Sequence, residues 1–142
     1  MSVLLELHSA DRLVRALVEG HMLARGIRPS FFALLCMIDI HAPITPSALS
    51  AESGLRPTGI RDIVNAMVEN GHVQRRPNAA DRRSHFLELT PAGKTFVREA
   101  GKSLLAIERR LDKELGAPVE EMRADLRGLR RAARAILARL PE

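Results

Sequence analysis

The sequence contains no tryptophan and no tyrosine, and aromatic residues make up only 3% of its 142 positions. Hydrophobic residues nevertheless account for 46% of the chain, which is far too many for a disordered protein. The core must therefore consist of Leu, Ile, Val, Met and Ala, a set that favours helices over sheets. The length suits one domain. We expect a mainly α-helical, single-domain protein.

Cysteine is also nearly absent, since Cys36 is the only one. A single cysteine excludes an internal disulfide framework and fits a reducing cytoplasm. The N-terminus lacks a signal-peptide pattern, because Glu6, His8 and Asp11 interrupt it. No apolar run approaches the ~18 residues of a membrane span. We therefore expect a cytoplasmic protein without a membrane partner. Cys36 lies in an apolar segment, where a thiol has a raised pKa and is unreactive rather than redox-sensing.

Sequence motifs of catalysis are missing as well. The chain has no P-loop, nucleophile elbow, paired-carboxylate motif or dinucleotide fingerprint. Its five histidines form no cluster with metal-ligand spacing. We expect neither an enzyme nor a bound cofactor or metal.

Lysine is rare too, because only three of the 22 basic residues are lysines and the rest are arginines. The net charge of +5 suits a polyanionic partner. The planar guanidinium donates two parallel hydrogen bonds to a phosphate or a guanine. A GC-rich genome would also enrich arginine, so the excess alone does not identify the partner.

Hydrophobic periodicity and the placement of Pro and Gly predict six helices and one hairpin. Thr45–Pro46 and Thr90–Pro91 each combine a capping threonine with a proline at the first helical position. The helices are expected at about 3–25, 29–42, 45–52, 56–70, 91–115 and 119–140, with strands at 73–76 and 85–89 around a polar turn, 77–83.

The last helix carries an apolar stripe in steps of three and four residues, which is a heptad pattern. The stripe comprises Val119, Met122, Leu126, Leu129, Ala133, Ile136 and Leu140. The N-terminal helix has a similar stripe. Because one small domain cannot readily cover three long amphipathic helices, we expect them to pack across the two-fold axis of a homodimer. The alternative is that they fold back on their own domain.

A short helix, a tight turn, a second helix and a basic hairpin follow one another in the order of a winged helix-turn-helix. In this motif the second helix enters the major groove of double-stranded DNA and the hairpin reaches the adjacent minor groove or backbone. Arg61 and Asn65 share one helical face, from which Arg can pair with guanine and Asn with adenine. Residues 56–98 carry eight Arg or Lys against four Asp or Glu. This local excess favours DNA over the alternative, a winged-helix protein-interaction module without sequence-specific DNA binding.

Three features of the sequence resemble the MarR family of bacterial transcriptional regulators. They are the segment V-N-A-M-V-E-N-G-H-V-Q-R at 64–75, the wing pattern at Asp81 and Arg83, and L-T-x-x-G at 89–93. The resemblance covers essentially the whole chain. It implies a winged helix-turn-helix core at 29–94 within a single domain, 1–142, and dimerisation helices at 1–26 and 95–142. It further implies a homodimeric regulator, expected to be a repressor, that binds a palindromic operator and responds to a small-molecule effector.

The predicted DNA-binding residues are Ser47, Arg56, Thr58, Gly59, Arg61, Asn65, Arg82 and Arg83. By the resemblance, Arg83 enters the minor groove, Arg82 contacts phosphate, and Asp81 orients Arg83 or braces the wing. Asp62 and Gly59 depart from the family's usual pattern. The effector pocket is expected among the N-terminal helix, the 31–38 segment and the 95–104 segment. The sequence identifies neither the effector nor the operator.

Overall fold

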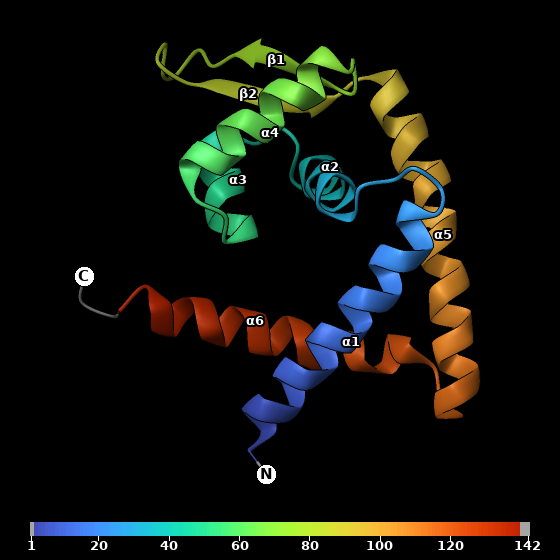
Figure 1. Ribbon diagram of the computed structural model, residues 1–142. Coiled ribbons are helices and arrows are strands. Elements are labelled where there is room, and N and C mark those ends of the chain that lie inside the picture. The colour runs from blue at the N-terminus through green and yellow to red at the C-terminus, as the bar shows by residue number, and fades with distance from the viewer. Residues whose placement is uncertain (1, 140–142) are drawn as a thin grey trace. The chain divides into compact units, whose positions relative to one another are not determined.

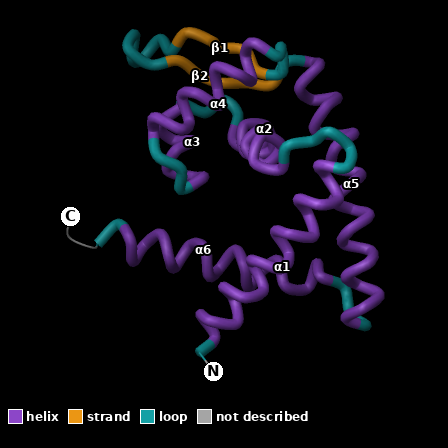
Figure 2. Tube along the Cα trace, viewed as in Figure 1, coloured by secondary structure: helices purple, strands orange, loops and turns teal. Residues whose placement is uncertain are grey.

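The computed structural model describes residues 2–139 and is mainly helical, with one two-stranded antiparallel hairpin (Figures 1 and 2). This confirms the predicted fold class. The elements are α1 (Val3–Leu23), α2 (Pro29–His41), α3 (Pro46–Ser53), α4 (Pro57–Glu69), β1 (Val73–Pro77), β2 (His85–Leu89), α5 (Pro91–Leu115), the 3₁₀ helix η1 (Val119–Met122) and α6 (Arg123–Leu137).

The chain divides into two compact units, Met1–Leu104 and Leu105–Glu142, and α5 contributes to both. The first unit contains the helix-turn-helix and the hairpin. The second contains the C-terminal half of α5 and all of α6. The expected single-domain organisation stays a prediction, and each unit is described by itself.

Local capping signals set the ends of the helix-turn-helix. Thr45 Oγ1 accepts a hydrogen bond from the Ala48 N–H at 3.2 Å, and Pro46 occupies the first position of α3. Gly54 ends α3 in the left-handed conformation, with φ of +72°. The start and the end of α3 are therefore set by three residues that the sequence already displays.

The main core of the first unit lies between α2, α3, α4 and the hairpin (Figure 1). Helix α2 supplies its centre, with Leu35 and Ile38 fully buried. The other buried members are Leu34, Ile44, Leu49, Ile60, Val64, Met67, Val73, Leu87 and Leu89. A smaller cluster of Met22, Phe32 and Ala100 joins α1, α2 and α5. These two clusters pack the helix-turn-helix and the hairpin against α2 and the start of α5.

A backbone pairing joins the start of the helix-turn-helix to the wing. Ile44 and Leu87 form an isolated antiparallel bridge, in which the Leu87 N–H donates to the Ile44 carbonyl at 2.8 Å. The Ile44 N–H donates in return at 3.4 Å. The hairpin is thereby fixed relative to α3, a link that the sequence pattern did not reveal.

The corner between β2 and α5 explains the L-T-x-x-G motif. Thr90 Oγ1 accepts from the Gly93 N–H at 3.0 Å, which caps α5, and donates to the Gly71 carbonyl at 2.6 Å. The Thr90 N–H donates to the His72 carbonyl at 3.0 Å. A Cβ atom at position 93 would lie 2.1 Å from that same carbonyl oxygen. Only glycine fits there, so the motif sets the close approach of α5 to the turn that follows α4.

The second unit begins its last helical segment differently from the prediction. Residues 119–122 form a 3₁₀ turn, and α6 starts at Arg123 rather than at Val119. The Val119 N–H donates to Asp112 Oδ1 at 2.7 Å, which anchors this turn after the break at Gly116. Tight 3₁₀ turns are common at helix starts.

The apolar stripe of α6 is not covered within its own unit. Leu126 and Ile136 are 53% and 61% exposed, and α6 contains no buried residue. Leu140, the last residue of the predicted stripe, lies outside the described residues.

Candidate nucleic-acid interface

Helix α4 presents a polar face to solvent and packs its apolar face against the core. Ile60, Val64 and Met67 are buried, and Ile63 is half-buried. The predicted contact residues on this helix and its N-cap are all exposed: Arg56, Thr58, Gly59, Arg61 and Asn65. The cap residue Arg56 makes no side-chain hydrogen bond to the first turn of α4. The N–H groups of that turn consequently face outward without a side-chain cap, an arrangement suited to phosphate.

Side chains hold the turn between the two strands in shape. Asp81 Oδ1 accepts a hydrogen bond from the Arg83 backbone N–H at 2.9 Å, and Asn78 Oδ1 accepts from the Ala80 N–H at 3.0 Å. The Ser84 N–H donates to the Asp81 carbonyl at 3.0 Å. Asp81 therefore constrains the backbone on which Arg83 is carried, while Arg82 and Arg83 are exposed.

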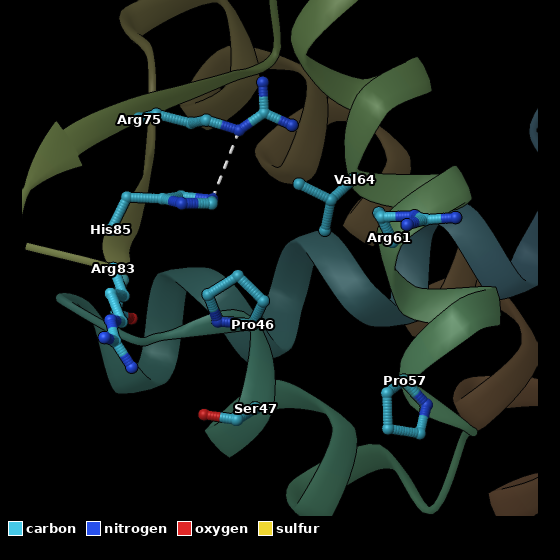
Figure 3. Close-up of a pocket in the computed structure, with 9 residues that line it drawn as sticks. Pro46, Ser47, Pro57, Arg61, Val64, Arg75, Arg83 and His85 are labelled. Atoms are coloured by element: carbon cyan, nitrogen blue, oxygen red, sulfur yellow. Dashed lines mark hydrogen bonds between the residues drawn. The ribbon is translucent and has the colours of Figure 1, made fainter.

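A cavity of about 340 Å³ lies between the helix-turn-helix and the hairpin (Figure 3). Three arginines from different elements line it: Arg61 of α4, Arg75 of β1 and Arg83 of the turn. Ser47 at the start of α3 lines it as well, whereas no carboxylate does. The structure thus brings Ser47, Arg61 and Arg83 to one cavity; Arg56, Thr58, Gly59, Asn65 and Arg82 are not among its lining residues.

Two residues of this cavity were not singled out by sequence reasoning, Arg75 and His85. Arg75 Nε donates to His85 Nε2 at 3.2 Å, and Arg75 Nη2 donates to Asn65 Oδ1. Figure 3 draws the first of these bonds as a dashed line. Burial, together with the positive charge of Arg75, lowers the pKa of His85 below its ordinary value of 6.5. Both residues lie on the strands of the hairpin, but the contact of Arg75 with Asn65 of α4 is tertiary.

Asp62, the acid on α4 that departs from the family's usual pattern, lies 4.0 Å from Arg61, with both side chains about three-quarters exposed. Such a surface pair contributes little to stability. Its charge nevertheless reduces the positive potential at the start of α4.

A larger cavity, about 590 Å³, lies on another face of α4. The His72 ring contacts both Phe31 and Phe96, with centroid distances of 6.0 and 4.7 Å. The remaining lining residues are Gly26, Arg28, Ser30, Asp62, Ile63, Ala66 and Asn70. The effector pocket was expected among the N-terminal helix, the 31–38 segment and the 95–104 segment. Phe31 and Phe96 of the last two segments line this cavity, whereas α4 and the turn after α1 take the place of the N-terminal helix. The helix periodicity could not reveal which helix borders the void, because that depends on side-chain packing.

Other candidate sites are less developed. Burial and the negative charge of Asp39 raise the pKa of the Cys36 thiol above its ordinary value, which favours the unreactive form. Among residues 2–139, no group of three or more His, Cys, Asp or Glu side chains is arranged to hold a metal ion. In the same range, no helix is both long and apolar enough to cross a membrane.

Comparison with known proteins finds one matching family model and a set of similar solved structures. Residues 25–84 match the model of the MarR family. No curated protein matches the chain. Among solved structures, wild-type MarR from E. coli in its apo form is 20% identical, with a TM-score of 0.76 over 93% of this chain and 97% of that one.

Two further structures share the fold over nearly the whole chain. The M. tuberculosis regulator MOSR in complex with DNA is 23% identical, with a TM-score of 0.72 over 99% of this chain and 100% of that one. S. aureus MarR in complex with salicylate and kanamycin is 18% identical, with a TM-score of 0.75 over 95% and 90%. The chain thus matches the MarR family model over its helix-turn-helix and much of its hairpin, and it shares the winged helix-turn-helix fold of these regulators over nearly its whole length.

Proposed function

We propose that this chain is a sequence-specific DNA-binding repressor that binds a palindromic operator as a homodimer and responds to a small-molecule effector. The observation that carries the proposal is the three-arginine cavity between α4 and the wing. Arg61, Arg75 and Arg83 come from three separate elements and meet without a carboxylate among the lining residues. Such a concentration of guanidinium groups on an exposed surface favours a polyanion.

In the proposed complex, α4 enters the major groove and the turn between the strands reaches the backbone or the minor groove. The exposed polar face of α4 supplies Arg61 and Asn65 for base edges, while Arg56, Thr58 and Ser47 contact the phosphate backbone. Gly59, which has open space around its Cα, allows the DNA backbone to approach α4 closely.

Arg83 is the proposed minor-groove residue, attracted by the negative potential of a narrow groove. Asp81 supports it by holding the Arg83 N–H rather than by pairing with the guanidinium, since the observed bond runs to the backbone at 2.9 Å. The guanidinium therefore stays available for DNA. Arg82, exposed beside it, contacts phosphate.

The homodimer is supported by apolar side chains that are exposed in each unit of the single chain. In α1, Leu4 and Leu13 are 70% and 71% exposed. In the stripe of η1 and α6, the exposed fraction ranges from 43% to 61% for Met122, Leu126, Leu129 and Ile136. Exposed apolar rows of this kind on otherwise charged helices are typical of subunit interfaces. A homodimer would bury them and present two copies of α4 to two half-sites.

The effector is proposed to bind in the 590 Å³ cavity that α4 helps to form. Its size suits a small organic molecule. A ligand contacting Ile63, Ala66 and Asn70 would touch the recognition helix directly, so occupancy and the position of α4 would be coupled. The salicylate complex of S. aureus MarR makes a small aromatic acid a reasonable first compound to test.

The direct test is the affinity of Arg83→Ala for a duplex that the unmodified protein selects from a random library. We expect a loss of roughly tenfold or more, because the groove contact disappears. The matched control is Arg98→Ala, which removes the same charge from an exposed position on α5. Equal affinity of the Arg83→Ala variant would contradict the wing assignment. Failure to select any sequence would favour a protein-interaction module instead.

A further inference from the structure

Arg75 connects the recognition helix to the wing through two hydrogen bonds from one guanidinium group. Its Nη2 donates to Asn65 Oδ1 on α4, and its Nε donates to His85 Nε2 on β2 at 3.2 Å (Figure 3). Asn65, Arg75 and His85 thus form a chain across three elements. We call these residues the Asn65–Arg75–His85 bridge.

The chemistry of the bridge fixes the orientation of the Asn65 amide. A guanidinium has donors and no acceptor, so the amide atom that faces Arg75 must be the oxygen. The NH₂ group of Asn65 then lies on the side of the amide away from Nη2. Without Arg75, the amide of an exposed asparagine rotates freely between orientations.

His85 holds the other end of the bridge in place. Because Arg75 Nε donates to it, His85 Nε2 must carry a lone pair, so the ring is neutral with its proton on Nδ1. The lowered pKa of His85 keeps the ring neutral at physiological pH. A guanidinium that is hydrogen-bonded at both ends has already lost most of its conformational entropy. Its position, and with it that of Asn65, therefore costs less entropy to fix when DNA binds.

We propose that Arg75 is a specificity-determining positioning residue, which orients Asn65 so that its amide NH₂ group donates to an acceptor on a base edge in the major groove. This inference rests on the proposed function, because it assumes that α4 reads DNA. Suitable acceptors are N7 of a purine, O6 of guanine and O4 of thymine, whereas cytosine presents an amino donor. Arg75 acts through Asn65 and does not itself read the base.

The test compares base preferences on a set of duplexes in which each operator position is varied in both half-sites. Arg75→Met is expected to reduce the preference at the Asn65 position by roughly tenfold, as far as Asn65→Ala does. The double variant should show no further loss at that position, because the two residues act on one contact. Preferences at other positions should be unchanged.

Arg75→Lys separates positioning from charge. Lysine keeps the positive charge but cannot donate from two fixed nitrogens to Asn65 and His85 together. The preference at the Asn65 position should therefore be lost in Arg75→Lys, while the salt dependence of binding stays as in the unmodified protein. Recovery of the preference by lysine would overturn the proposal. So would a uniform loss of affinity in Arg75→Met that leaves the preference at the Asn65 position intact, since that marks a contribution of charge alone.

Asn65→Asp provides a gain-of-preference test. A carboxylate still accepts from Arg75, but the outward group changes from a donor to an acceptor. The preferred base at that position should shift toward cytosine, whose amino group donates. An unchanged preference would contradict the donor role of Asn65.

If the unmodified protein shows no sequence preference at all, the proposed function fails, whereas a preference that Arg75→Met leaves intact refutes only the positioning role. Thermal unfolding of each variant checks that these exposed substitutions leave the fold intact.

Discussion

The two units of the chain use the same kinds of apolar residue in opposite ways. In the first unit, Leu35, Leu49 and Met67 are completely buried in a core that α2, α3, α4 and the hairpin share. In the second unit, Leu126 and Leu129 are 53% and 43% exposed although they lie on a regular heptad stripe. The difference indicates that the winged unit completes its core within one chain. The C-terminal unit, by contrast, leaves its apolar stripe uncovered, as the proposed dimer interface requires.

Disrupting the stripe should have the largest effect on function. Leu129→Glu introduces a charge into the proposed dimer interface, and we expect sedimentation to show a monomer at micromolar concentration. Operator affinity should fall by roughly 100-fold or more, because each monomer then engages only one half-site. Ala135→Glu is the matched control, since it adds the same charge at an exposed position of α6 outside the stripe. A dimer that survives Leu129→Glu would contradict the interface.

Truncating a core residue and truncating a stripe residue should change thermal stability in different ways. Only the effect of the stripe truncation should depend on protein concentration. Leu35→Ala should lower the free energy of unfolding by about 2–5 kcal/mol at any concentration, because it leaves a cavity in a closed core. Leu126→Ala should act mainly by weakening association, so the change in its melting temperature varies with concentration. Thermal denaturation over a hundredfold range of concentration measures both. A concentration-independent loss in Leu126→Ala would show that the stripe packs within its own chain.

Two glycines of α5 test how closely the winged unit is packed. Gly93→Ala should destabilise the protein by about 1–3 kcal/mol or more, because the new methyl group meets the His72 carbonyl oxygen. Gly101→Ala has open space and lies inside the helix, so it should be neutral or stabilising by up to ~1 kcal/mol. Chemical denaturation gives both values. Equal stabilities of the two variants would contradict the close contact at the Thr90–Gly93 corner.

The smallest expected effect concerns pH. Since the pKa of His85 is lowered in the folded protein, the unfolded chain binds the proton more readily. The contribution of His85 to stability is therefore complete above pH 6.5 and decreases as the pH falls below 6.5 toward the lower folded pKa. His85→Gln, which retains an acceptor for Arg75 but does not titrate, should show a shallower loss of stability over this range. An identical pH profile would argue against a perturbed His85.

Sequence patterns predicted the elements of the fold well because their signals are local. Thr45–Pro46, Gly54 and Thr90–Pro91 mark helix ends through hydrogen bonds within a few residues. The tertiary links were missed for a physical reason. The Ile44–Leu87 pairing joins residues far apart in the chain, so no local spacing indicates it.

In the candidate site, too, the features with local sequence signals were predicted and the tertiary contacts were not. Exposure of the polar face of α4 follows from its 3.6-residue period, and the wing turn follows from its Asp and Arg residues. The contacts that Arg75 makes with Asn65 and His85 depend instead on how β1 lies against α4. The position of the larger cavity likewise depends on which side chains leave space, not on helical periodicity.

The central claim is that two copies of the winged unit, joined through the apolar stripes, read a symmetric DNA site. Selection of duplexes from a random library by the full-length protein tests it most directly. We predict a palindromic consensus whose half-site centres are about one helical turn, roughly 10–10.5 base pairs, or a multiple of it apart. An asymmetric single site, or no enriched sequence, would contradict the account.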